Sequence, residues 1–317
     1  MMKDILTTRK IIEELDKKIF NSENILNKNS LEVYRIKHGE DYILFCFSKN
    51  KNEKTFMEGE FFIYSSREKI AELIGEEYKE EKEPYVIKIT IHTPNPTKEL
   101  RDLIRENRSL MLEYYVTSSH EIAHYLLLKS LNEEEGQKNR KRIRKINKYE
   151  KNLYPHDIKR QKEGSLNWID FYLRNLLPFL TYFEMYAHSV SILTILDMLK
   201  ENKISVQEAK EFFGELLLFF FHNAAKFKKE YIRNGKLEVK DVKDLEKLDH
   251  LSASYIISWI LFKKLNENEI VELYEEFENN IDVIKKLFGE IKERSKSNFF
   301  EEAEKLQQIA VMYDFSV

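Results

Sequence analysis

The sequence predicts an α+β fold, with a small β-sheet early in the chain and a largely helical second half. Eight Gly and five Pro among 317 residues are few, which favours long helices over an all-β sandwich. Apolar residues make up 42% of the chain and aromatic residues 13%, enough for a substantial core. The predicted strands all lie before residue 93, and long segments with helical apolar spacing follow, so the sheet is expected early and most of the helices late.

The first part of the chain predicts a helix followed mainly by strands. The expected elements are a helix at 4–21, two strands within 31–48 around a turn at 38–41, a strand at 58–66, a short helix at 67–78 and a strand at 85–92. The last strand, "YVIKITIH", has the clearest alternation and ends before the prolines of "TPNPT". A small sheet is therefore predicted before residue 93.

The second part of the chain predicts long helices. From Thr97 onward the sequence has neither Pro nor Gly for more than thirty residues and keeps a helical apolar rhythm, with a break expected near Arg108. The later helices are expected at 168–199 (interrupted at Pro178), 205–232 and 244–265, before an amphipathic tail at 267–297. We therefore predict one domain at 1–200 and a helical C-terminal domain at 201–317.

Residues 138–162 differ in composition from the rest of the first predicted domain. Eleven Lys and Arg residues face only Glu150 and Asp157, which gives the segment a net charge of +9. It is interpreted as a basic, flexible insertion. Three roles remain open: a solvated flap over a cleft, a nucleic-acid contact made by neutralising phosphates, or a segment whose displacement opens the active site.

Composition also limits the class of protein. The net charge of −3 identifies no partner, and Cys46, the only cysteine, allows neither an intrachain disulfide nor a thiolate zinc site. The N-terminus is charged throughout and has no secretory signal pattern. The longest apolar runs are much shorter than the roughly 20 residues of a membrane span. A cytoplasmic protein without a membrane segment is expected.

The stretch "TSSHEIAHYL", residues 117–126, predicts half of a metal site on a helix. Positions i and i+4 share one helix face, so His120 and His124 can direct imidazole nitrogens at one ion. Glu121 is rotated by about 100° from His120 and lies beside the ion without binding it. Zinc lowers the pKa of a bound water to about 7, and Glu121 can act as the general base for that water. The alternative is a pair of hydrogen-bonded helix histidines.

Catalytic zinc needs a third protein ligand, and no further histidine follows the motif closely. Glu184 lies within an apolar helix, where an unpaired carboxylate would cost several kcal/mol, so a cation or hydrogen-bond donors should accompany it. The small residue Ala187 would face the same site. His188, four residues after Glu184, shares its helix face and is the alternative third ligand, or a group near the metal, or core.

With these residues, the chain resembles the gluzincin branch of the zincin metallopeptidases, and within it the cytoplasmic regulatory metalloproteases. The resemblance covers about residues 30–195 and depends on His120, Glu121 and His124, followed on a later helix by Glu184 with Ala187. It implies a zincin-like fold, with the small sheet packed on the active-site helix. It also implies a sheet edge that binds the substrate as an added strand, for which residues 85–92 are the candidate.

Gluzincins commonly use a Tyr or His donor to stabilise the transition state. The late histidines His222 and His250 are the candidates, with His222 preferred, and either can instead be hydrogen-bonded core. Tyr182 and Tyr186 flank Glu184, but seventeen tyrosines in the chain make that position uninformative.

The predicted function is that of a zinc metallopeptidase, which hydrolyses peptide bonds of a peptide or protein through a metal-activated water. His120, His124 and Glu184 would bind Zn²⁺, and Glu121 would act as general base. The alternative is a non-catalytic zincin-like binding or structural protein, associated with nucleic acid through residues 138–162.

Overall fold

A computed structural model of the chain describes residues 2–28, 30–62, 84–134, 177–233, 236–237, 239 and 248–262, with single positions at 272, 275 and 282. The helix predicted at 67–78 and the basic segment at 138–162 lie outside these residues, as does the tail at 267–297 apart from the three single positions. The chain divides into two compact units, Met1–Lys129 with Val190–Met198, and Ser130–Ser189 with Leu199–Val317. The domain boundary predicted after residue 200 stays a prediction.

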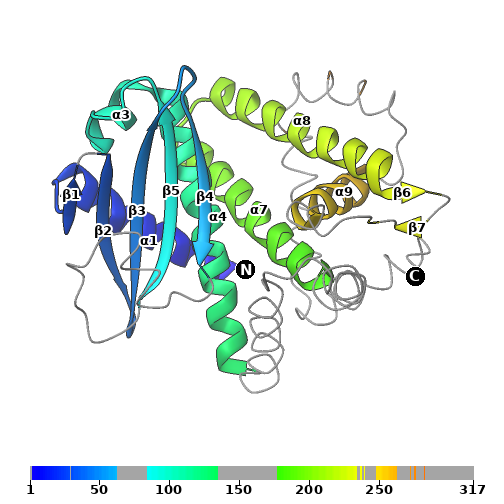
Figure 1. Ribbon diagram of the computed structural model, residues 1–317, viewed down its shortest axis with the longest axis horizontal. Helices are drawn as coiled ribbons and strands as arrows, with labels where there is room; N and C mark the ends of the chain where they lie inside the picture. Colours follow the sequence, from blue (N-terminus) through cyan, green and yellow to red (C-terminus); the bar gives the residue numbers. More distant parts are fainter. Residues whose placement is uncertain are drawn as a thin grey trace, which may run out of the picture. The chain divides into compact units, whose positions relative to one another are not determined.

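The described residues form a mixed α/β structure with a five-stranded sheet and six helices, which confirms the predicted α+β class (Figure 1). The sheet lies in the first unit and has the order β1-β2-β3-β5-β4. Its strands are β1 (Leu26–Lys28), β2 (Leu31–His38), β3 (Asp41–Lys51), β4 (Phe56–Phe62) and β5 (Tyr85–Thr93). Only the β3–β5 pair is parallel.

The position of β5 corrects one prediction. Residues 85–92 were expected to form a free edge of the sheet, but β5 pairs with β3 on one side and with β4 on the other. Among the described strands, the edges are β1 and β4. The alternating pattern of β5 is confirmed, because Ile87, Ile89 and Ile91 are all fully buried on one face.

The β2–β3 hairpin follows the sequence prediction. His38 pairs with Asp41 across a two-residue turn, in which Gly39 has φ of +63°. Glycine enters this left-handed region without steric cost, and its place at the start of a two-residue hairpin turn is typical. The turn brings Asp41 to the end of the hairpin, where it meets the motif helix described below.

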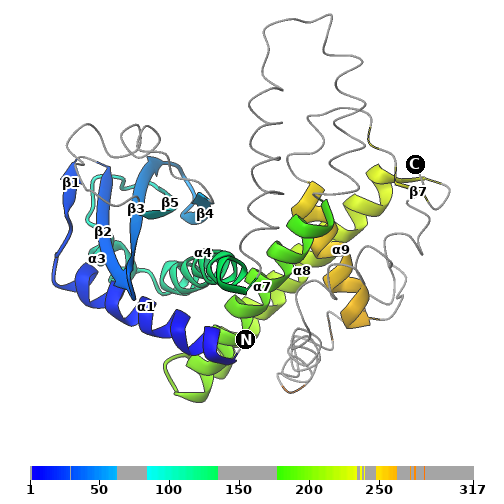
Figure 2. The same cartoon turned by 90° about the horizontal axis from the view of Figure 1, so that it is seen from below.

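Helices cover one face of the sheet, where the main core lies. Figure 2 shows α1 (Met2–Phe20) and α4 (Arg108–Glu134) on the same side of it. Their buried side chains join the sheet and α3 (Leu100–Glu106) in one hydrophobic cluster, which includes Leu15, Phe47, Leu103 and Tyr114. A small cluster on the opposite face contains Cys46, and burial raises the pKa of its thiol to about 12. Cys46 is therefore part of the core.

The expected helix break near Arg108 is confirmed at Asn107. This residue is extended, with φ of −123° and ψ of 103°, and separates α3 from α4. Its side-chain Oδ1 accepts a hydrogen bond from the backbone N–H of Leu110 at 3.1 Å, as an N-cap residue does. The cap begins the helix that carries His120 and His124.

The second unit contains helices and a short hairpin. It includes the first part of α7 (Leu177–Lys200), then α8 (Val206–Tyr231), a hairpin of β6 (Ile232–Arg233) and β7 (Lys236–Leu237), and α9 (Leu248–Phe262). Pro178 lies in the first turn of α7, where a missing N–H breaks no helical bond, so it does not interrupt the described helix. Thr181 of α7 and Ser252 of α9 share a buried hydrogen bond of 2.5 Å.

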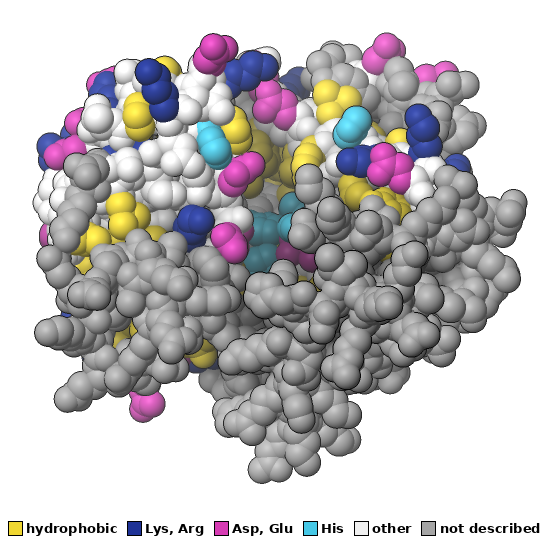
Figure 3. All heavy atoms as spheres, in the orientation of Figure 1, with side chains coloured by type: hydrophobic (Ala, Val, Ile, Leu, Met, Phe, Trp, Pro, Cys, Tyr) yellow, Lys and Arg dark blue, Asp and Glu magenta, His cyan; other side chains and the backbone are white. Residues whose placement is uncertain are grey.

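Residues Val190–Met198 of α7 belong to the first unit, where they pack on α4. The hydroxyl of Ser191 donates a hydrogen bond to the carbonyl oxygen of Val116 at 3.2 Å. Within the described part of the chain, no helix has the length and apolar character that crossing a membrane requires. On the face shown in Figure 3, acidic and basic side chains of the described residues are interspersed.

Candidate metal centre

The two motif histidines lie side by side on α4. The Nε2 atoms of His120 and His124 are 3.1 Å apart, and their rings are nearly perpendicular at a centroid distance of 4.7 Å. Two nitrogens bound to one tetrahedral zinc at 2.0–2.1 Å lie about 3.3 Å apart, so this separation suits a divalent ion. A hydrogen bond between the two imidazoles, the alternative to a metal site, gives the same separation.

Glu121 completes a cluster of three possible ligand groups on α4. One atom each of His120, Glu121 and His124 lie within 4.8 Å of one another, and Glu121 and His124 are buried. Small buried residues surround the motif, namely Ser118, Ser119 and Ala123. The helix therefore holds a carboxylate beside two imidazoles in a confined space, where a proton acceptor next to a metal-activated water would have to lie.

The edge strand β4 lies against this face of α4. The backbone N–H of Met57 donates a 2.9 Å hydrogen bond to Glu113, and the ring of Phe61 stacks on that of His124 at 6.3 Å. Met57 and Phe61 also pack against the main core. Met57 and Phe61 of β4 thus contact α4 at Glu113 and His124, which lie before and after Glu121.

A second polar network adjoins the C-terminal side of the motif. The hydroxyl of Tyr125 lies 2.8 Å from Nδ1 of His38 and donates to Asp41 at 3.3 Å. Lys129 donates to the same Asp41 oxygen at 2.8 Å. Burial lowers the pKa of His38 below its usual value of 6.5, and the positive charge of Lys129 lowers it further, against a smaller opposing effect of Asp41. The neutral imidazole is therefore the form that the fold favours.

This network predicts that the first unit loses stability in acid. Because the pKa of His38 is lower in the folded than in the unfolded chain, its stabilising contribution is complete above about pH 6.5 and declines as the pH falls below that value. We expect the urea midpoint of the wild type to fall between pH 7.5 and 5.5, and to fall less for His38→Gln, which keeps a polar group near Tyr125. Equal declines in both proteins would contradict the assignment to His38.

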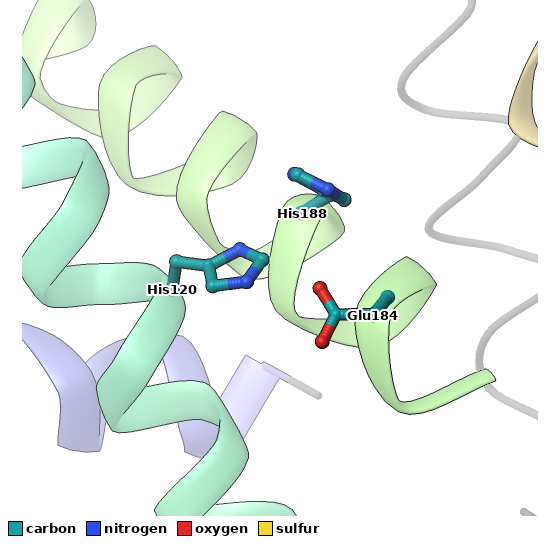
Figure 4. Close-up of side chains that lie close together, drawn as sticks. All are labelled: His120, Glu184 and His188. Atoms are coloured by element: carbon teal, nitrogen blue, oxygen red, sulfur yellow. The ribbon is translucent and has the colours of Figure 1, made fainter. Parts of the chain in front are cut away.

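The predicted third ligand is buried on α7. Glu184 is 8% exposed, and its Oε2 lies 3.1 Å from Nδ1 of His250 on α9. Figure 4 shows the side chains of Glu184 and His188 on the same face of α7, and the ring of His120 projecting from α4. The sequence expectation that this carboxylate is buried is confirmed, while the cation or hydrogen-bond donors expected beside it stay a prediction.

The alternative ligand His188 contacts aromatic side chains of α8. Its ring lies 5.1 Å from that of Phe220, edge to face, and 6.3 Å from that of Phe219. It is half-buried there. These contacts favour a packing role for His188, while its place on the helix face of Glu184 keeps it within the set of candidates.

Sequence reasoning underestimated His250 and missed Asp249. Glu184, Asp249 and His250 form a second cluster with possible ligand atoms within 4.8 Å of one another. Burial raises the pKa of Asp249, and the charge of Glu184 adds to this effect while His250 opposes it. Asp249 and His250 lie in the first turn of α9, more than sixty residues from Glu184. Only the packing of α9 on α7 brings them together, so no local pattern could have indicated the contact.

The preferred transition-state donor, His222, lies exposed on α8 and belongs to none of the possible metal-binding clusters among the described residues. Tyr186 is buried on α7. The surroundings of His222 and Tyr186 therefore do not support a role as transition-state donor, whereas His250 lies next to Glu184.

Comparison with known proteins adds no relative. No family model, no curated protein and no solved structure matches the chain. The function is therefore inferred from the residues of the chain and their geometry.

Proposed function

We propose that the protein is a zinc metallopeptidase of gluzincin type, with a zincin-like fold and a cytoplasmic location. The observation that carries the proposal is the 3.1 Å separation of the two Nε2 atoms on α4, with the buried Glu121 beside them. His120 and His124 would each bind the metal through Nε2. A bound Zn²⁺ would supply Lewis-acid activation of water and of the scissile carbonyl group.

Glu184 is proposed as the third protein ligand. Its support comes from its burial and its acidic character. His250 would hold the Glu184 carboxylate in one orientation.

Glu121 is proposed as the general base. It accepts a proton from the attacking water and later delivers it to the leaving amine. Glu121 is buried and its side chain lies against Gly59 of β4, which limits the positions open to its carboxylate and favours a reactive geometry.

The proposed peptide-binding edge is β4 in place of the predicted β5. Since the N–H of Met57 bonds to Glu113 and not to β5, the backbone groups of Met57 face away from the sheet. Residues two apart in a strand share their orientation, so the backbone groups of Gly59 and Phe61 face the same way. An extended substrate could pair with these groups directly beside Glu121 and His124.

Metal analysis of the purified chain tests the proposal. We expect about one zinc per chain in the wild type and a loss of most of it in His120→Ala. His92→Ala, a matched change on β5 at a residue outside the possible metal-binding clusters of the described residues, should retain the metal. A wild-type protein that binds no zinc when supplied with it at neutral pH would exclude the proposed function.

The same measurement distinguishes the third ligands. If Glu184 binds zinc, Glu184→Gln should weaken zinc affinity by at least tenfold while His188→Ala has little effect. The reverse order would assign the third position to His188.

A further inference from the structure

At Gly59 the strand β4 has no room for a side chain against the motif helix α4. An ideal Cβ atom placed on Gly59 would lie 2.5 Å from Oε1 of Glu121 and 2.8 Å from its Cγ. It would also lie 2.8 Å from the Cγ2 methyl of Thr117. Non-bonded carbon atoms normally approach to about 3.5–4.0 Å, so even one methyl group does not fit. The side chain of Glu121 fills the space that Gly59 leaves.

The backbone conformation does not explain the glycine at this position. Among the described glycines only Gly39 has a positive φ, so a residue with a side chain could adopt the conformation of Gly59 without strain. Both neighbours of Gly59 in β4 are glutamates, which shows that the strand accepts large residues on its other face. The requirement for glycine therefore comes from the contact with α4.

The strand cannot move away from α4 at low cost. Gly59 pairs with Ile89 in the middle of the β4–β5 ladder. Two residues before it, Met57 is hydrogen-bonded to Glu113, and two residues after it, Phe61 stacks on His124. A methyl group at position 59 would therefore displace mainly the flexible end of Glu121, together with the methyl group of Thr117.

We propose that Gly59 is a positioning residue for Glu121. This inference rests on the proposed function: the absent side chain of Gly59 creates the space in which the Glu121 carboxylate handles protons. The three atoms nearest to the added Cβ belong to Glu121 and Thr117, and none to a proposed metal ligand. Gly59→Ala should accordingly move the base while leaving the zinc ligands in place.

The first test compares Gly59→Ala with the wild type as full-length, zinc-loaded proteins acting on casein. We expect kcat to fall about 100-fold, the size of effect that a misplacement of about 1 Å produces, with KM and zinc content close to wild type. Glu60→Ala is the matched control, since Glu60 is 58% exposed and alternation places it on the opposite face of β4. A folded, zinc-bound Gly59→Ala protein with wild-type kcat would overturn the proposal.

The second test needs no activity and therefore separates this inference from the proposed function. If the methyl group collides with Glu121, Gly59→Ala should lower the urea midpoint much less in a Glu121→Ala background than in the wild type. Thr117→Ser, which removes the methyl group of Thr117, should relieve only part of the loss. Equal losses in the wild-type and Glu121→Ala backgrounds would overturn the inference, whether or not casein is cleaved.

The comparison of the single and double variants also tests the inference if Gly59→Ala fails to fold. Folding of the Gly59→Ala/Glu121→Ala double variant would then support the collision, and its failure to fold would overturn it. The wild type could bind zinc but cleave no casein, while Gly59→Ala lowers the urea midpoint less in the Glu121→Ala background than in the wild type. Gly59 would then still position Glu121, and only the peptidase proposal would be weakened.

Discussion

Replacing Glu121 with Gln is expected to lower casein hydrolysis by about 10²–10⁴-fold, the range that a positioned acid–base residue contributes. Gln has the shape of Glu, so it should still fit beside Gly59 and preserve the packing of α4. The amide cannot accept a proton from water or deliver one to the leaving amine. We therefore expect kcat to fall while zinc content, the circular dichroism spectrum and the urea midpoint stay near wild type.

A matched Glu→Gln change on the surface controls for the loss of one charge. Glu13 lies exposed on α1 and makes only a 3.8 Å contact with Arg9 among its ion pairs in the described residues, so Glu13→Gln should leave kcat unchanged. If Glu121→Gln cleaves casein as fast as the wild type, another group handles the protons and the peptidase mechanism proposed above is wrong.

Replacing Glu32 with Ala is expected to lower the free energy of unfolding by about 3–5 kcal/mol, the usual effect of leaving one partner of a buried ion pair alone. Oε1 of Glu32 lies 2.7 Å from Nζ of Lys49, and both side chains are at most 3% exposed. The hydroxyl of Tyr34 and the backbone N–H of Leu100 also donate to this carboxylate, at 2.6 and 2.9 Å. The change would leave the buried Lys49 ammonium without its counter-charge, although still bonded to the carbonyl oxygen of Lys98, and two donors without their acceptor.

Two comparisons in urea denaturation, followed by circular dichroism, establish the cause of this loss. The double variant Glu32→Leu/Lys49→Met removes both charges and should recover the part of the loss that the unpaired Lys49 ammonium causes, while the donors of Tyr34 and Leu100 still lack their acceptor. Breaking the exposed pair of Glu60 and Lys88, 3.8 Å apart, should cost less than about 1 kcal/mol. A Glu32→Ala protein as stable as the wild type would show that the buried network contributes little.

The sequence predicted the local elements of the fold better than their arrangement. The β2–β3 hairpin and the helix break at Asn107 were predictable because a glycine turn and a loss of helical rhythm are local signals. The position of β5 was predicted wrongly because period-two alternation identifies the buried face of a strand and not its neighbours. A usable signal did exist: β4 contains "EGE", and charged residues are typical of edge strands, whereas β5 is rich in Ile and Val.

In the candidate site too, local features were predictable from the sequence and contacts between distant elements were not. The spacing of His120 and His124 was enough to predict their proximity, since helix geometry alone fixes it. The apolar neighbours of Glu184 were enough to predict its burial. The contact of Glu184 with His250 and the passage of Gly59 over Glu121 could not be predicted, because both depend on the packing of elements that are distant in sequence.

The contacts of α4 on either side of the motif have a consequence for the free energy of metal binding. Glu113, before the motif, accepts the N–H of Met57, and after the motif Lys129 bonds to Asp41 and Tyr125 to His38. A helix that is hydrogen-bonded on both sides of the motif has already lost most of its conformational entropy on folding. Binding of an ion by His120 and His124 should then cost little further conformational entropy of the helix. The dissociation constant of the metal should therefore be lower than for the same ligands on a flexible segment.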